Sequence, residues 1–235
     1  MASFWKVKNE GKIRMFGWLL LTLGATGCTN QENSSPGKNV PISSQEEKLA
    51  PSTKKNIVFF GNSLTAGYGL DPSESFPALI QARLDSLGIP YKVINAGVSG
   101  ETTADGLSRI DWILQQPVAV FILELGGNDG LRGIPVNETF KNLQEIIVKV
   151  KEKYPQAKII LAGMQVPPSM GNTYSVQFRS LFPRLAQENN LHFLPFLLKG
   201  VGGVPELNQA DGIHPTAKGD RIVAENVWTI LKEIL

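Results

Sequence analysis

Phe59-Phe60-Gly61-Asn62-Ser63-Leu64-Thr65-Ala66-Gly67-Tyr68-Gly69 is the stretch around which this chain is organised. The apolar run from Ile57 to Phe60 is typical of a buried strand, and it ends abruptly in small and polar residues. In α/β proteins the carboxyl ends of parallel strands form the edge at which ligands bind. Ser63 is therefore a candidate nucleophile, provided that a base, an acid and oxyanion donors lie elsewhere in the chain. The alternative is a serine that only caps a helix.

Apolar, strand-like runs alternate with segments of helical periodicity over the rest of the chain. Strands are predicted at 57–60, 91–95, 118–125, 158–162 and 191–194. Helices are predicted at 76–87, 107–114, 137–154, 174–189 and from Thr216 onward, with Pro183 expected to kink or divide the fourth of them. This alternation predicts one α/β domain with a doubly wound, five-stranded parallel sheet.

Three loops that follow predicted strands carry small and polar residues. They begin after Phe60, Ala96 and Leu125, and the third contains Gly126-Gly127-Asn128-Asp129-Gly130. In a parallel sheet these loops share one edge, where the Asn128 amide and the N–H groups of Ser63 and Gly100 are candidate oxyanion donors. The alternative for the third loop is an ordinary tight turn.

The chain contains only two histidines, and they lie in different settings. His192 falls inside the fifth predicted strand, which favours a structural role. His214 lies in a loop three residues after Asp211, whose carboxylate can hold one ring nitrogen and leave the other to accept a proton from Ser63. In the alternative, Asp211 only satisfies the loop backbone and His214 is solvated.

Several other classes of function find little support. Asp211 and His214 would supply only two metal ligands, so no metal site is expected, and no organic cofactor is required. The glycine-rich phosphate-binding motifs are absent. The chain carries a formal charge of +2, but residues 1–27 contribute +3, which leaves −1 over residues 28–235. This charge predicts no basic surface for nucleic acid.

Four separated blocks together carry a resemblance to a known family. Gly61-Asn62-Ser63-Leu64, the Gly100 segment, Gly127-Asn128-Asp129 and Asp211-Gly212-Ile213-His214-Pro215 occur in the order and spacing of the SGNH, or GDSL, hydrolases. The sequence around Asn128 is most similar to that of the arylesterase, acyl-CoA thioesterase and lysophospholipase branch. The resemblance implies a three-layer, flavodoxin-like α/β/α fold. It also implies a Ser63–His214–Asp211 triad, with oxyanion donors at Ser63, Gly100 and Asn128.

One residue departs from the family pattern. The first block usually has aspartate before the serine, whereas this chain has Asn62. Asparagine keeps an acceptor and the shape of aspartate but loses the charge. We expect altered hydrogen bonding or an altered pKa around this residue, with the mechanism retained.

The sequence indicates the substrate less sharply than the reaction. Apolar residues that flank the blocks either line an acyl groove or pack beneath the loops: Leu131, Ile134, Val166, Pro167 and Ile213. The main prediction is a serine esterase acting on carboxylic esters or thioesters. A carbohydrate or cell-wall O-acetyl esterase is the alternative within enzymes, and a non-catalytic lipoprotein that binds acyl or glycan ligands is the alternative from another class.

The N-terminal part of the chain resembles a lipoprotein export signal. A basic segment precedes an apolar run that is shorter than the ~20 residues of a membrane span. Cys28, the only cysteine, follows small residues as in a lipobox, although Ala25 stands where that motif prefers leucine. We predict a signal peptide at 1–27, lipidation at Cys28, a polar flexible tether at 28–54 and the hydrolase domain at 55–235. These predictions imply an exported, membrane-anchored protein; an ordinary signal peptide with an incidental thiol is the alternative.

Overall fold

The computed structural model describes residues 54–235. The predictions for the signal peptide, Cys28 and the tether as far as residue 53 lie outside the described residues. Within the described range, no helix combines the length and the apolar character that crossing a membrane requires.

The described chain forms a five-stranded, fully parallel sheet in the order β2-β1-β3-β4-β5. The strands are β1 (Lys55–Gly61), β2 (Tyr91–Gly97), β3 (Val120–Glu124), β4 (Lys158–Ala162) and β5 (His192–Leu194). The predicted sheet is confirmed. Gly61 at the end of β1 pairs with Gly97 of β2 and with Glu124 of β3, so three strands end level with one another. This common end is the edge at which the sequence predicted a site to assemble.

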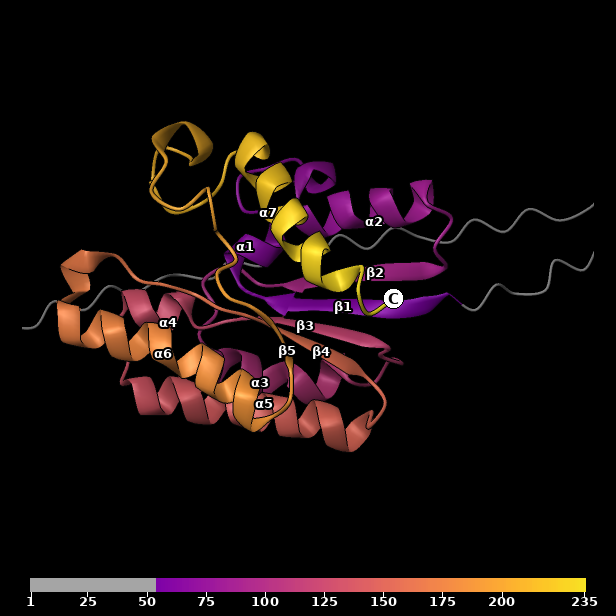
Figure 1. The fold of residues 1–235 in the computed structure, drawn as a ribbon, viewed down its shortest axis with the longest axis horizontal. Helices are drawn as coiled ribbons and strands as arrows, with labels where there is room; N and C mark the ends of the chain where they lie inside the picture. The colour runs from indigo at the N-terminus through magenta and orange to yellow at the C-terminus, as the bar shows by residue number, and fades with distance from the viewer. Residues whose placement is uncertain (1–53) are drawn as a thin grey trace, which may run out of the picture. The chain divides into compact units, whose positions relative to one another are not determined.

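Helices cover both faces of the sheet and complete the three-layer α/β/α arrangement (Figure 1). On one face α2 (Phe76–Ser86) packs against α7 (Ala217–Leu231). On the other face α5 (Val136–Lys153) packs between α3 (Thr103–Ile113) and α6 (Asn172–Glu188). The remaining short elements of the described chain are α1 (Ser63–Ala66), α4 (Gly127–Leu131) and the 3₁₀ turns η1 (Pro72–Glu74), η2 (Pro168–Met170) and η3 (Pro205–Leu207).

The core lies along the central strands. Ile57 to Phe60 of β1 are completely buried, as are Phe121 and Leu123 of β3. β1 lies between β2 and β3 and is covered by helices on both faces, which explains why its sequence is continuously apolar rather than alternating. Full burial of each such side chain stabilises the fold by about 1.5–3 kcal/mol. The core therefore holds rigidly the strand that ends at the Ser63 turn.

Two predictions about individual residues are wrong. α6 continues through Pro183 as one helix. Pro183 lies on the exposed face, where water can satisfy the carbonyl left without its N–H partner, while Phe178 and Phe182 hold both halves of the helix in the core. His192 does lie in β5, but this short edge strand leaves its side chain exposed to solvent instead of packing it in the structure.

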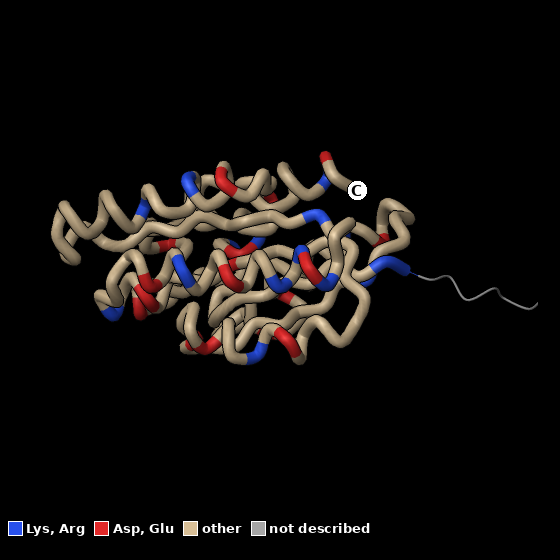
Figure 2. The backbone as a smooth tube through the Cα atoms, turned by 90° about the horizontal axis from the view of Figure 1, so that it is seen from below, with Lys and Arg blue, Asp and Glu red and all other residues tan. Residues whose placement is uncertain are grey.

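Charges of both signs are interspersed along the described chain (Figure 2). Four carboxylates of the described chain are buried instead of exposed: Glu101, Glu124, Asp129 and Asp220. Asp220 of α7 is buried, and its Oδ2 accepts the Phe76 N–H at the start of α2 over 2.8 Å. Burial raises the pKa of Asp220 to about 7, against the opposing effect of the Phe76 hydrogen bond.

This carboxyl group predicts that stability falls as the pH rises. The folded protein retains a proton on Asp220 that the unfolded chain releases near its ordinary pKa, so the stabilisation is complete below about pH 4 and is lost as the pH passes about 7. We expect the melting temperature to fall by at least ~3 °C between about pH 5.5 and pH 8. Asp220→Asn should reduce this dependence in thermal unfolding monitored by circular dichroism, and the part that remains should come from Glu124, whose pKa burial also raises to about 7. An unchanged pH dependence in Asp220→Asn would contradict the assignment.

Candidate active site

Ser63 lies in a tight strand-to-helix turn at the carboxyl edge of the sheet. Asn62 is the N-cap of α1, because its Oδ1 accepts the Leu64 N–H over 2.9 Å. Ser63 is thus the first residue of the helix and not its cap, and its hydroxyl is free for another role. A Cβ on Gly97 would lie 2.3 Å from the backbone nitrogen of Ala66. Glycine at 97 therefore lets α1 pack directly onto the end of β2, which orients the turn.

His214 and Asp211 stand in line with the Ser63 hydroxyl. The distance from His214 Nε2 to Ser63 Oγ is 2.8 Å, and that from His214 Nδ1 to Asp211 Oδ2 is 2.6 Å. The other oxygen of Asp211 accepts the N–H groups of Ile213 and His214 over 2.9 and 3.0 Å. Asp211 therefore both shapes its own loop and orients the imidazole, two roles that the sequence had left as alternatives.

The loop that carries Asp211 and His214 is closed by backbone and side-chain bonds of one residue. The Gln209 N–H donates to the His214 carbonyl over 2.7 Å. Its side-chain Nε2 donates to the carbonyls of Tyr68 and Pro215 over 2.7 and 2.9 Å. Since Tyr68 belongs to the Ser63 segment, Gln209 ties the Ser63 loop to the His214 loop. The rings of Tyr68 and His214 also lie 4.5 Å apart, which restricts rotation of the imidazole.

The ionisation of Asp211 determines which ring nitrogen of His214 carries the proton. The hydrogen bond from the His214 side chain, followed by those from the backbone N–H groups of His214 and Ile213, lowers the pKa of Asp211 to about 2. Asp211 is therefore a carboxylate at neutral pH and can only accept a hydrogen bond, here from the Nδ1–H of His214. Nε2 is left without a proton when the imidazole is neutral, and it faces the Ser63 hydroxyl as a base.

The candidate oxyanion donors lie around the same edge. Asn128 lies in the first turn of α4, and its Nδ2 donates one hydrogen bond to the Glu101 carbonyl over 2.8 Å. An amide group has two N–H bonds, so one remains for a substrate oxygen. The Ser63 N–H is the first of α1, where no intrahelical acceptor exists. Gly100 has a φ of +84°, which glycine adopts without strain, and its carbonyl accepts a bond from Arg132 over 2.9 Å.

Two ionic residues, Asp129, which is buried, and Arg109, which is partly buried, support these donors, and sequence reasoning assigned them no role. Asp129 accepts the Thr103 N–H over 2.9 Å and the Thr103 hydroxyl, which ties α4 to the start of α3. Arg109 of α3 forms an ion pair with Glu101 and donates to the Ala96 carbonyl over 2.8 Å. Asp129 belongs to the sequence block Gly127-Asn128-Asp129, but the sequence did not reveal that its side chain is buried. Nothing in the local sequence around Arg109 pointed to the site.

A cavity of about 460 Å³ opens beside Ser63 and Asn128. Four of the five predicted groove residues line it: Leu131, Val166, Pro167 and Ile213. Ile134 does not line it, because the chain turns away at Gly133, and the Ile134 carbonyl is held by the Tyr174 hydroxyl over 2.7 Å. Met164, Phe196 and Leu198 line the cavity without having been predicted. They follow β4 and β5, whose ends share the edge with the recognised blocks.

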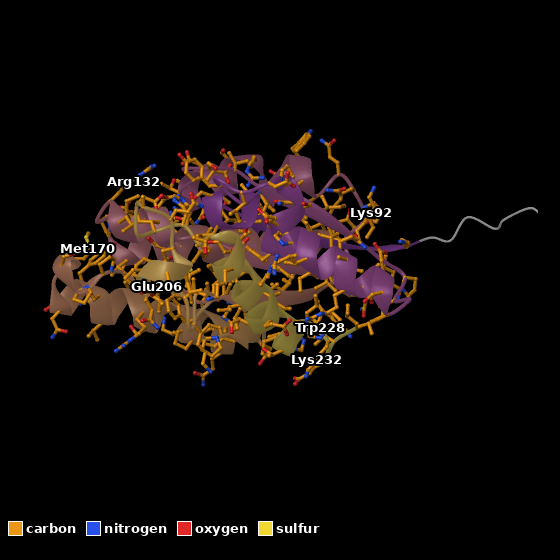
Figure 3. The ribbon with its side chains drawn as sticks, turned by 90° about the horizontal axis from the view of Figure 1, so that it is seen from above. Lys92, Arg132, Met170, Glu206, Trp228 and Lys232 are labelled. Carbon is orange, nitrogen blue, oxygen red and sulfur yellow. The ribbon has the colours of Figure 1, made fainter. Side chains whose placement is uncertain are left out.

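The lining of the cavity is mostly apolar, with the polar side chains of Gln165 and Asn208 added to those of Asn62, Ser63 and Asn128, and one rim is exposed. Arg132 and Met170 lie at the opposite end of the molecule from Lys92, which stands at the start of β2 (Figure 3). The side chains of Leu131 and Ile213 are 38% and 45% exposed at the mouth of the cavity. A search of residues 54–235 finds no cluster of three or more side chains suited to holding a metal ion.

Comparison with known proteins identifies the relatives of this arrangement. The GDSL-like Lipase/Acylhydrolase family matches residues 59–222, a range that includes all four blocks. Esterase TesA of Pseudomonas aeruginosa is 40% identical over 182 residues, which cover 77% of this chain and 90% of that protein. Thioesterase 1/protease 1/lysophospholipase L1 of Escherichia coli K12 is 35% identical over 170 residues, which cover 72% of this chain and 79% of that protein.

The fold is shared with a solved esterase. The crystal structure of the psychrotrophic esterase EstA from Pseudoalteromonas sp., inhibited by monoethylphosphonate, superimposes with a TM-score of 0.72 at 32% identity. The match covers 76% of this chain and 97% of that one. The three-layer architecture expected from the sequence blocks is thereby confirmed.

Proposed function

The chain belongs to the GDSL-like lipase/acylhydrolase family and is a serine esterase of the SGNH type, and from this premise we propose that Ser63 is its nucleophile. In this proposal His214 is the general base and acid, and Asp211 is the acid that orients it. The Ser63 N–H, the Gly100 N–H and the Asn128 amide form the oxyanion hole. The unbroken sequence of short contacts from Asp211 through His214 to Ser63 Oγ carries the assignment.

The reaction begins when Nε2 of His214 takes the proton of Ser63 Oγ. The oxygen attacks the carbonyl carbon of the ester or thioester, and the resulting oxyanion is stabilised by the three donors, each contributing about 3 kcal/mol. Collapse of this intermediate breaks the bond to the alcohol or thiol, which leaves with the proton from His214. The acyl group then remains on Ser63 Oγ.

Hydrolysis of the acyl-serine repeats these steps with water. His214 removes a proton from the attacking water, and the second oxyanion occupies the same donors. When it collapses, the carboxylic acid leaves and Ser63 Oγ recovers its proton from His214. The negative charge of Asp211 stabilises the imidazolium that forms in both halves of the cycle. Apart from the substrate and the water, these steps use only groups of the chain.

The lining of the cavity favours a substrate whose acyl group is apolar. Leu64, Met164, Phe196 and Leu198 join the predicted apolar residues around it, and its volume of about 460 Å³ is within the usual range for a small-molecule site. We propose medium-chain acyl esters and thioesters as substrates. An O-acetyl esterase acting on carbohydrates would need polar groups for sugar hydroxyls, and the apolar lining favours it less.

A fluorophosphonate probe tests the reaction. Only an activated serine attacks such a probe, so we expect one molecule of probe per chain, attached to the peptide that contains Ser63. Prior treatment with substrate should slow the labelling. Absence of labelling, or labelling at another serine, would refute the assignment and would favour a non-catalytic binding protein.

A chain-length series of p-nitrophenyl esters tests the acyl preference. We expect kcat/KM to rise from acetate to medium chains, at up to roughly 4-fold per added methylene from burial of about 0.8 kcal/mol. Acetylated xylan should be a poor substrate in the same assay. A maximum at acetate together with rapid deacetylation of xylan would instead support the carbohydrate esterase.

We further propose that the enzyme is exported and anchored through a lipid on Cys28, with residues 55–235 as its hydrolase domain. The basic and apolar segment before Cys28 and its lipobox-like position support this proposal. Metabolic labelling with palmitate should mark the wild type. Labelling that persists in Cys28→Ala would contradict the anchor.

A further inference from the structure

A buried carboxylate lies directly beneath the Ser63 turn and takes no part in the steps described above. Glu124 is the last residue of β3, and its side chain is completely buried. Its Oε2 accepts the Asn62 N–H over 3.1 Å and the Thr65 hydroxyl over 2.8 Å. Its Oε1 accepts the Asn62 Nδ2 over 2.9 Å. Glu124 thus holds the residues on both sides of Ser63.

The backbone of β1 is shaped to admit this carboxylate. Gly61 pairs with Glu124 across the sheet. A Cβ on Gly61 would lie 2.5 Å from Glu124 Oε2 and 2.1 Å from Thr65 Oγ1, distances that no real side chain tolerates. Glycine at 61 therefore leaves the space in which Glu124 reaches the turn. This close fit makes the position of the turn depend on the carboxylate.

The partners of Glu124 are hydrogen-bond donors, and none of those in the described chain is a cation. The charged groups of the neighbouring elements bond to residues other than Glu124. Arg109 of α3 pairs with Glu101 and donates to the Gly61 carbonyl over 3.4 Å, Asp129 of α4 bonds to Thr103, and His214 bonds to Asp211. Burial raises the pKa of Glu124 to about 7, while the bonds from Thr65 and Asn62 oppose the rise. Three donors suit the ionised carboxylate, which can only accept.

Asn62 is the residue that makes this arrangement possible with a single carboxylate. Its Oδ1 accepts the Leu64 N–H as the cap of α1, and its Nδ2 donates to Glu124. An aspartate at this position could still cap the helix but has no N–H to donate. Its second oxygen would face Glu124 Oε1 across about 2.9 Å. Two carboxyl groups at that distance must share a proton and titrate as a pair.

We propose that Asn62 and Glu124 form a positioning pair that holds the Ser63 turn, and that asparagine at 62 keeps Ser63 in place at alkaline pH. The proposal rests on the function proposed for Ser63. Neither residue touches the reacting atoms, so the pair acts through the orientation of the Ser63 hydroxyl. The family's usual aspartate at this position would make the same support depend on a shared proton.

Reversing the direction of the Asn62–Glu124 bond tests the pair. In Glu124→Gln an N–H bond must face a donor in either orientation of the new amide, so we expect kcat to fall at least ~10-fold with KM changed less than ~2-fold. In Asn62→Asp we expect kcat/KM within ~3-fold of wild type near pH 6.5. It should then fall at least ~10-fold relative to wild type by about pH 9.5, where the shared proton is lost.

The double variant Asn62→Asp/Glu124→Gln restores all of these bonds and reverses the direction of only the bond between side chains 62 and 124. The new carboxylate at 62 accepts from the new amide at 124, whose oxygen still accepts the backbone N–H of residue 62 and the Thr65 hydroxyl. We expect kcat within ~3-fold of wild type and no additional alkaline loss. The rate of fluorophosphonate labelling should rank the variants as kcat does, with the double variant close to wild type and Glu124→Gln well below both. Asp220→Asn is the matched control, because it alters another buried carboxyl group away from Ser63 and should leave kcat unchanged.

The outcomes separate this inference from the proposed function. If Ser63→Ala retains activity and labelling, the proposed function fails. If Ser63→Ala is inactive but Glu124→Gln stays within ~2-fold of wild type at every pH, the positioning pair is refuted. A double variant no better than Glu124→Gln also refutes it. Should Glu124→Gln fail to fold, the double variant decides: a folded, active protein supports the pair, and an unfolded one overturns it.

Discussion

Ser63→Ala is expected to lower kcat at least ~10⁴-fold while KM changes little, because it removes the atom that forms the acyl intermediate. The Ser63 hydroxyl makes its side-chain bond to His214, whereas the cap of α1 and the support of the turn come from Asn62 and Glu124. The variant should therefore fold with the same melting temperature to within a few degrees. Residual hydrolysis should come from the oxyanion donors acting on bound ester and water.

The measurement is hydrolysis of a p-nitrophenyl ester by protein purified from a host without background esterase. Ser180→Ala is a matched control, since Ser180 is an exposed serine of α6 whose hydroxyl bonds only to the Gln177 carbonyl over 2.8 Å. It should retain full activity and full fluorophosphonate labelling. A Ser63→Ala enzyme with more than about 1% of wild-type kcat would exclude Ser63 as the nucleophile.

Asp211→Asn has the second largest expected effect, a fall in kcat of ~10³–10⁴-fold near neutral pH. The oxygen of the new amide should stay with the N–H groups of Ile213 and His214, which it already accepts. Its NH₂ group then faces Nδ1 of His214 and can only donate to it. The imidazole must accept there and carry its proton on Nε2, so it presents a donor to Ser63 and cannot act as its base.

The pH dependence distinguishes this effect from a loss of structure. Because the pKa of Asp211 lies at about 2, its ionisation should not contribute to any loss of wild-type activity above about pH 4. Asp211→Asn should lower kcat across this range and leave KM within ~3-fold of wild type. Asp71→Asn is the matched control, since Asp71 accepts the backbone N–H of Ser73 over 2.9 Å in a similar local turn. An Asp211→Asn enzyme with a tenth or more of wild-type kcat would contradict the orienting role.

The sheet could be predicted because its signals are local. β4 has the predicted bounds, and the centre of β1 coincides with the run Ile57 to Phe60. A strand buried on both faces must be apolar at every position, and such a run can be recognised without its neighbours. The predictions were wrong for residues whose placement depends on contacts with distant parts of the chain. Pro183 stays in a helix because tertiary packing holds both halves, and Ile134 is turned from the cavity by its bond to Tyr174.

The order of the blocks also predicted which loops meet, since parallel strands end at a common edge. It did not reveal the supports of the site. Arg109, Asp129 and Glu124 reach the catalytic loops through partners that are distant in the sequence. A charged residue near a strand or helix end is ordinary in sequence, and only its burial and its partners show that it has a specific task.

By itself, the sequence determined the strands, the parallel sheet and the side chains able to carry acyl transfer, because hydrophobic periodicity and residue chemistry are properties of short segments. The tertiary structure decided the distances. Ser63 and His214 are 151 positions apart in the chain, and their contact at 2.8 Å depends on two loops being held at one edge of the sheet. Likewise, Asn62 is an unexplained substitution in the sequence, and it acquires a partner only when folding places Glu124, 62 positions away, beneath the Ser63 turn.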